Sequence, residues 1–144
     1  MTAALVTPAE IRVWFETLTP TTLAEIRHVY AEDAAFKDPF QAVQGVAAIQ
    51  AIFAHMFQAL EAPRFVILTE MAHADQVFLT WDLRFRAPRL GPHEQVIHGA
   101  SHLLLGADGR IVRHRDYWDA AEELYEKVPG LGLLMRWLKR RAMR

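Results

Sequence analysis

The chain has 144 residues, of which 52% are hydrophobic and 23% charged, and its formal net charge is −1. This balance is typical of one globular domain and excludes a disordered chain, while the near-zero net charge gives the whole molecule no attraction to nucleic acid. Because the sequence contains no cysteine, disulfides, thiolate metal sites and a cysteine nucleophile are excluded.

The N-terminal residues, MTAALVTPAE, lack the basic region that opens a signal peptide. No apolar run approaches the roughly 18 residues that a membrane-spanning helix needs. We therefore expect a soluble protein of the cytoplasm.

The first part of the sequence predicts helices around one short strand. Thr7 is a candidate N-cap, Pro8 suits the first helical position, and apolar residues keep helical spacing as far as Leu18. A second helix is predicted over residues 22–30, and a short strand over residues 34–38. Three N-terminal helices are expected in all, because a third follows this strand.

The third helix is predicted from Gly45 to Leu60, where apolar residues keep a period of 3.6. After Pro63 the period changes to two, which is typical of strands with one buried face. Four strands of an antiparallel meander are predicted, over residues 64–72, 77–85, 93–105 and 111–118. Helices and strands that are segregated in this way indicate an α+β fold, with the helices on one face of a curved sheet.

We divide the chain into a domain over residues 1–120 and a helical extension over residues 121–144. Residues 131–144 contain five basic residues and no acid, and one helical face carries Leu131, Leu134, Met135, Leu138 and Ala142. We favour packing of this basic helix over the domain or against another subunit. An anionic membrane surface is the second interpretation, and nucleic acid is the least favoured because no aromatic platform accompanies the basic residues.

Three stretches of this sequence resemble the nuclear transport factor 2-like superfamily. They are YAEDAAFKDP at residues 30–39, the helix from Gly45, and LGADGRIVRHRDYW at residues 105–118. The resemblance covers about residues 7–120 and implies a cone-shaped, cystatin-like fold and a homodimer. SnoaL-like polyketide cyclases, steroid Δ-isomerases and limonene epoxide hydrolase share this fold, which hosts many activities.

Asp38 stands directly before Pro39, and this dipeptide commonly marks a turn. Steroid isomerases keep at this position the aspartate that moves a proton between carbons of an enone, so the resemblance implies that Asp38 is a general base. Trp14 falls at the tyrosine of their oxyanion hole, and Ser101 lies near its second acid. With Tyr30, these two side chains are expected to orient polar atoms of a ligand. The alternative for Asp38 is a solvated turn residue that accepts backbone N–H groups.

Strand alternation puts His114, Asp116 and Trp118 on one face of the last strand. The resemblance implies that this face lines the pocket, where His114 and Asp116 would act as a base with its orienting carboxylate, or as a proton shuttle. The alternatives are a structural hydrogen-bond network that closes the cone, or a set of side chains at a dimer contact.

The remaining histidines and aromatics give weaker signals. His98 and His102 share one strand face and match no zinc signature, so we predict no metal site and an exposed histidine row. Trp81 belongs to the apolar stripe of residues 77–85, which is expected in the core and along a cavity. Further candidate walls of the cavity are Tyr30, Phe40 and Phe57.

The sequence therefore predicts a small-molecule pocket and no cofactor. The favoured function is an isomerase- or cyclase-type enzyme that uses an aspartate for proton transfer on a small apolar or cyclic carbonyl ligand. The alternative is a non-catalytic module of the same fold, either a ligand carrier or a dimerising interaction domain.

Overall fold

The computed structural model describes residues 5–123 and 130–143, and its first helix begins where the sequence predicts. Thr7 Oγ1 accepts a hydrogen bond from the backbone N–H of Glu10 at 3.2 Å, and helix α1 follows over Pro8–Glu16. The side-chain cap satisfies one of the backbone donors that every helix start leaves unpaired. Helix α1 then packs its apolar side on the sheet, against strand β3 (Glu61–His73).

The second predicted helix differs from the structure in type and in length. Residues Thr22–His28 form a 3₁₀ helix, η1, and Tyr30 opens strand β1 (Tyr30–Lys37). The structure thus has two N-terminal α-helices and one 3₁₀ helix where three helices were predicted. The reason is pairing across the chain, because Ile111 donates a backbone hydrogen bond to Val29 at 2.8 Å and draws the next residue into the sheet.

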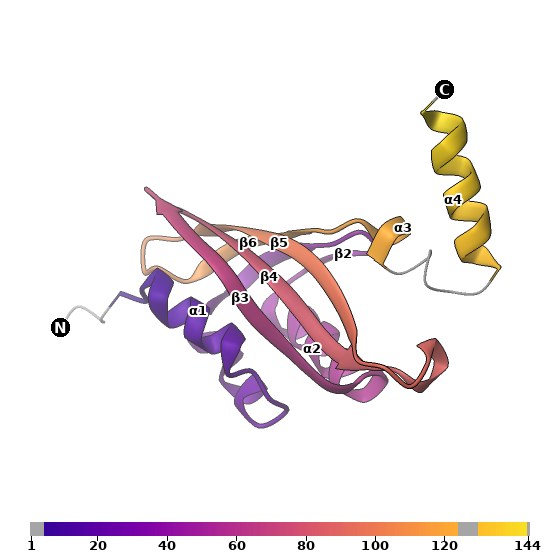
Figure 1. The fold of residues 1–144 in the computed structure, drawn as a ribbon. Coiled ribbons are helices and arrows are strands. Elements are labelled where there is room, and N and C mark those ends of the chain that lie inside the picture. Colours follow the sequence, from indigo (N-terminus) through magenta and orange to yellow (C-terminus); the bar gives the residue numbers. More distant parts are fainter. Residues whose placement is uncertain (1–4, 124–129, 144) are drawn as a thin grey trace.

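Six strands form one curved sheet (Figure 1) in the order β2-β1-β6-β5-β4-β3. Strand β1 runs parallel to β6, and all other neighbours are antiparallel, which confirms the predicted meander from β3 to β6. The short strand β2 was not predicted, and β5 begins two residues later than expected. Besides β1 and β3, the strands are β2 (Ala42–Gln44), β4 (Gln76–Arg86), β5 (Gln95–Leu105) and β6 (Ile111–Tyr117).

Helix α2 (Val46–Ala59) lies against the same sheet, in contact with β1 and β3. Residues Pro88–Leu90 form a second 3₁₀ helix, η2, in the loop before β5. After β6 come the short helix α3 (Ala120–Glu123) and helix α4 (Leu131–Ala142). Figure 1 shows α4 standing apart from the sheet, at the opposite end of the molecule from the N-terminus.

Alternation along the strands decides which side chains form the core. In β4 every second residue is buried, from Val77 through Trp81 to Phe85, as the sequence predicted. Trp14 of α1 and Phe53 of α2 pack edge to face at 5.8 Å between their ring centroids, beneath this strand face. The helices therefore bury the inner face of the sheet, which removes about 150–250 Å² of surface from water for each large aromatic residue.

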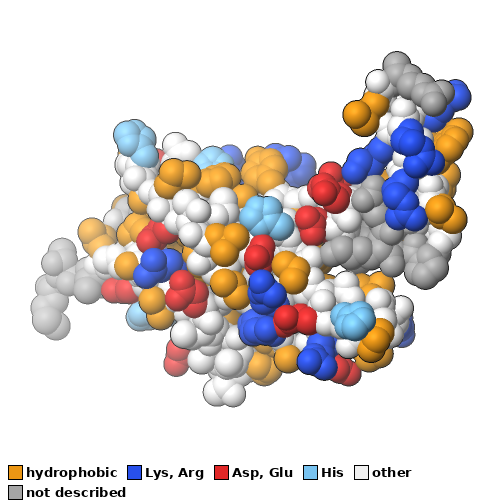
Figure 2. Space-filling view, viewed as in Figure 1, with side chains coloured by type: hydrophobic (Ala, Val, Ile, Leu, Met, Phe, Trp, Pro, Cys, Tyr) orange, Lys and Arg blue, Asp and Glu red, His pale blue; other side chains and the backbone are white. Residues whose placement is uncertain are grey.

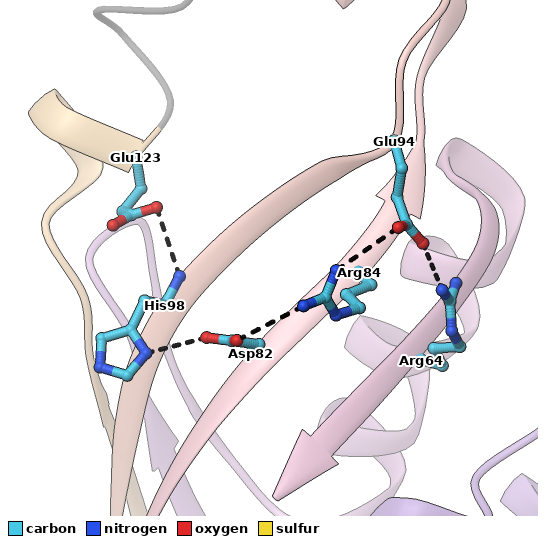
Figure 3. A network of polar contacts seen from close by, with 6 residues as sticks. All are labelled: Arg64, Asp82, Arg84, Glu94, His98 and Glu123. Carbon is cyan, nitrogen blue, oxygen red and sulfur yellow. Dashed lines mark hydrogen bonds and ion pairs between the residues drawn. The ribbon is translucent and has the colours of Figure 1, made fainter. Parts of the chain in front are cut away.

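The outer face of the sheet carries charged and polar pairs (Figure 3). His98 Nδ1 lies 2.9 Å from Asp82 Oδ1, which confirms that the His98 side of β5 faces outward. On the same face Arg84 and Arg64 both contact Glu94, and the Arg64 hydrogen bond lowers the pKa of that carboxyl group. These exposed pairs each contribute little to stability.

Gly99 of β5 provides a test of how tightly the inner face is packed. A Cβ atom on Gly99 would lie 2.5 Å from Cη2 of Trp81, its cross-strand partner. We expect Gly99→Ala to destabilise the fold by about 1–3 kcal/mol in denaturant unfolding, because the indole must shift within a packed core. Ala100→Thr, on the outer face of the same strand, should change stability by less than about 0.5 kcal/mol. Equal stability of Gly99→Ala and the parent would contradict the close packing.

Candidate functional site

A cavity of about 310 Å³ lies between helix α2 and the inner face of the sheet. Its walls are mainly apolar and aromatic, as is usual for small-ligand pockets, and its volume is at the lower end of their range. The apolar residues that line it are Phe36, Phe40, Ile52, Phe53, Met56, Ala59, Leu60, Phe65, Trp81, Leu83, Phe85, Leu90, Ile97 and Trp118. Phe40 and Trp118 meet edge to face at 5.2 Å, and the exposure of Phe40 places this pair at the rim.

Few polar side chains reach the cavity. They are Asp38, Gln41, His55 and Asp116, and no lysine or arginine belongs to the described residues that line it. The lining is therefore acidic or neutral, which favours an uncharged or cationic ligand over an anionic one.

Asp116, on β6, is held by a hydrogen-bond chain that begins on β4. The indole N–H of Trp81 donates to Ser101 Oγ at 2.9 Å, and the Ser101 hydroxyl donates to Asp116 Oδ1 at 2.5 Å. An indole can only donate and a carboxylate can only accept, so the direction of both bonds is fixed. Cross-strand register brings this about, because Ser101 stands directly opposite Asp116. The side chain of Asp116 is 16% exposed, and its Oδ2 accepts no hydrogen bond from the part of the chain that the structure describes.

The chain continues from Asp116 into the core through His114 and Tyr30. His114 Nε2 lies 2.5 Å from Asp116 Oδ1, and His114 Nδ1 lies 2.6 Å from the Tyr30 hydroxyl. Burial, and secondly the charge of Asp116, raises the pKa of Tyr30 well above its ordinary value of 10.0. Tyr30 therefore stays protonated. The Asp116 carboxylate can only accept, so His114 Nε2 donates to it, and Nδ1 of the neutral ring then accepts from the Tyr30 hydroxyl.

Asp38 lies at the same cavity but has different partners. Its Oδ1 accepts backbone hydrogen bonds from Phe40 at 2.8 Å and Gln41 at 3.0 Å, and its Oδ2 accepts from the Gln41 side chain at 3.3 Å. This is the hydrogen bonding of an Asx turn, which fixes the loop between β1 and β2. Asp38 thus combines a turn role with a place on the cavity wall.

The structure brings some of the predicted ligand residues together at the cavity and leaves others in the core. Phe40, Trp81 and Trp118 line it, beside Asp38 and Asp116. Trp14, Tyr30 and Phe57 do not belong to the described lining. Trp14 is buried among Phe15, Tyr30 and Phe53, and its Nε1 has no hydrogen-bond partner among the described residues. Ser101 and His114 reach the site through Asp116.

Some residues of the site were not found from the sequence. Gln41, Leu90 and Ile97 come from loops and from β5, and the sequence pattern gave no sign that they share one cavity. The bond from Trp81 to Ser101 was also missed, although both residues were named as candidates. Their inward alternation was readable, but the register that sets them side by side depends on strand pairing.

Among the described residues, no group of three His, Asp or Glu side chains is placed to hold a metal ion. The histidines of the outer face are engaged with other side chains, His98 with Asp82 and His102 with Gln76.

Comparison with known proteins identifies the family of this fold. A family model described as a SnoaL-like domain matches residues 11–114. Among curated proteins, the comparison finds no match to this sequence.

Solved structures match over most of the chain. A protein from Catenulispora acidiphila with a ketosteroid isomerase-like fold, in complex with trimethylamine, has 19% identity and a TM-score of 0.70, covering 83% of this chain and 92% of its own. A protein from Jannaschia assigned as a SnoaL-like polyketide cyclase has 13% identity and a TM-score of 0.69, with 80% and 87% covered. TerC, co-crystallised with polyporic acid, has 14% identity and a TM-score of 0.66, with 81% and 95% covered. At these identities the likeness establishes the fold alone.

Tyr30→Phe tests the buried end of the hydrogen-bond chain. Loss of the hydroxyl leaves His114 Nδ1 unpaired in the core. We therefore expect the free energy of unfolding of the variant at neutral pH to be about 1–2 kcal/mol lower than that of the parent. Above pH 10.0 an unfolded tyrosine ionises while the folded one, with its raised pKa, does not. The free energy of unfolding of the parent should therefore fall by about 1.4 kcal/mol per pH unit relative to that of the variant. The difference in stability between the two proteins should then disappear.

The measurement is the free energy of unfolding of both proteins as a function of pH. Tyr117→Phe is the matched control, because Tyr117 is exposed on the same sheet. A gap between the parent and Tyr30→Phe that stays constant through pH 10.0 would contradict the assignment of Tyr30 as a buried donor.

Proposed function

This chain belongs to the SnoaL-like family, and on that premise we propose that it is a small-molecule enzyme in which Asp116 transfers a proton on an apolar carbonyl ligand. The observation that carries the proposal is the hydrogen bonding of Asp116 at the cavity. One carboxylate oxygen is fixed by Ser101 and His114, while the other remains for a ligand.

The geometry suits a general base. Asp116 is an aspartate on the wall of a mostly apolar cavity, where few other polar side chains compete for a ligand. Two short hydrogen bonds to Oδ1 fix the carboxylate plane, which reduces the reorganisation needed for proton transfer. Tyr30 and His114 are positioning residues in this proposal, because they act on the ligand through Asp116.

The proposed reaction is a proton shift within one molecule. The Asp116 carboxylate removes a proton from a carbon next to the ligand carbonyl, and the electron pair of that C–H bond forms an enolate. The protonated Asp116 then returns the proton, to the same carbon or to another carbon of the conjugated system, so that no other reactant is needed. Three lining residues besides Trp81 carry side-chain N–H groups, namely Gln41, His55 and Trp118, and we propose that one of them donates to the enolate oxygen.

Asp38 is the less suitable base of the two. All three hydrogen bonds that its carboxylate accepts come from its own turn, and both carboxylate oxygens are used. We propose that Asp38 shapes the cavity wall and adds negative charge beside Asp116.

The lining supports a small and uncharged ligand. A volume of about 310 Å³ with aromatic walls suits a compact cyclic molecule, and the lack of a lysine or arginine among the described lining residues disfavours phosphates and carboxylates. Two structural neighbours were crystallised with trimethylamine and with polyporic acid, which supports a small organic ligand.

We include a homodimer in the proposal. Apolar side chains are exposed on the outer face of the sheet at Val66, Leu68, Met71 and Tyr117. A second copy that covered this face would remove them from water without closing the cavity on the opposite side.

The second candidate function is non-catalytic binding of the same class of ligand. The observation that favours it is the dominance of apolar side chains on the cavity wall. The two functions differ in whether a bound ligand exchanges its protons.

Proton exchange in D₂O separates them. We expect the parent protein to catalyse deuterium uptake next to the carbonyl in a panel of small cyclic ketones and enones, followed by NMR. Asp116→Asn should lower the exchange rate by about 10²- to 10⁴-fold, because the amide keeps the shape and the acceptor oxygen but loses the basicity. Asp38→Asn is the matched control and should lower the rate by less than about tenfold, since an asparagine oxygen can still accept the two backbone hydrogen bonds of the turn.

Ligand binding is measured in parallel by calorimetry with the same panel. Undiminished exchange by Asp116→Asn would overturn the role of Asp116. Binding by the parent without any exchange would overturn the enzyme and leave the ligand carrier.

A further inference from the structure

Helix α4 differs in charge from the rest of the chain. Its twelve residues include Arg136, Lys139, Arg140 and Arg141 and no acid, whereas residues 1–130 hold eleven basic residues against seventeen acids. Figure 2 shows basic side chains gathered over α4, beside hydrophobic ones, at one end of the molecule. An acidic body thus carries a basic helix.

The apolar side chains of α4 are exposed to an unusual extent. Leu134, Trp137 and Leu138 lie three and four residues apart, which puts them on one side of the helix, and they are 50%, 49% and 44% exposed. Arg136 and Arg140 lie on the opposite side, and Arg141 lies over the Trp137 ring, with its guanidinium carbon 5.4 Å from the centroid. A helix of a globular domain normally buries such an apolar stripe.

We infer that α4 is an interfacial helix that binds the surface of an anionic lipid bilayer. The Leu and Trp side would enter the region between headgroups and acyl chains, and the basic side would face the lipid phosphates. Tryptophan is enriched at that depth because its ring is amphipathic. This inference does not depend on the proposed chemistry of the cavity.

The length of α4 agrees with a helix that lies in the membrane plane. Twelve residues extend about 18 Å, and a helix of this length is only marginally stable alone in water. None of the helices that the structure describes has the length and apolar character needed to cross a membrane. A lipid surface would stabilise α4 along its length without insertion across the bilayer.

Charge and the exposed leucines together favour lipid over an α4–α4 pair and over nucleic acid. Pairing of α4 with the α4 of a second copy would bring two basic helices together, which is unfavourable. Nucleic acid would satisfy the cations but would leave the leucines in water. An anionic bilayer satisfies both sides of the helix at once, while its charge repels the acidic body.

The test is co-sedimentation of the full chain with vesicles. We expect it to bind vesicles of equal parts phosphatidylglycerol and phosphatidylcholine, to bind phosphatidylcholine alone at least about tenfold more weakly, and to dissociate at high salt. The double variant Arg136→Glu with Arg140→Glu should bind the mixed vesicles at least about 25-fold more weakly, from about fivefold per cation lost. Arg86→Glu with Arg89→Glu makes the same charge change on the body and should bind like the parent.

Leu134→Ser with Leu138→Ser tests the apolar side and should weaken binding by more than about tenfold. Unchanged unfolding midpoints show that these surface variants keep the fold. Failure of the parent to bind the mixed vesicles would overturn the inference, as would equal weakening by the two charge variants. The inference would also be overturned if the parent bound no vesicles and the leucine variant had a lower mass than the parent in light scattering. That result would favour packing between copies.

Discussion

A carboxylate beside an apolar cavity must be hydrogen-bonded, and the way this protein meets that constraint determines its site. Asp116 is held by Ser101 and His114, and these are held in turn by Trp81 and Tyr30. The chain of bonds crosses four adjacent strands, β4, β5, β6 and β1. The same bonds that make burial of the polar groups tolerable also fix the acid in one orientation, so stability and the proposed chemistry depend on one network.

The cavity lies between α2 and the inner face of the curved sheet (Figure 1). Close packing continues elsewhere, for example where Trp81 lies against Gly99, so the hollow is a local feature of a dense core. Seven of its eighteen lining residues are Phe or Trp, and such large rigid side chains enclose a space that smaller flexible ones would fill. A SnoaL-like fold thus provides an apolar space and a few fixed polar groups, and the identity of those groups sets the activity.

Two parts of the chain differ in charge and in the exposure of their apolar side chains. The domain has an acidic balance and an apolar interior, whereas α4 is basic and exposes its leucines. The domain accounts for the family match over residues 11–114, and α4 lies beyond it. The proposed ligand site and the proposed membrane contact are therefore separate features that can be altered independently.

The sequence by itself determined the fold class and the faces of the strands. The period of two in residues 77–85 and the Thr7 cap are local signals, and the structure confirms both. Tertiary pairing decided what local signals could not: Tyr30 enters the sheet because it pairs with Ile111, although its spacing resembles a helix. The site followed the same rule. Alternation put His114, Asp116 and Trp118 on one face of their strand, but only strand register set Ser101 opposite Asp116. Contacts between residues distant in sequence depend on how whole strands align, and no local period records that alignment.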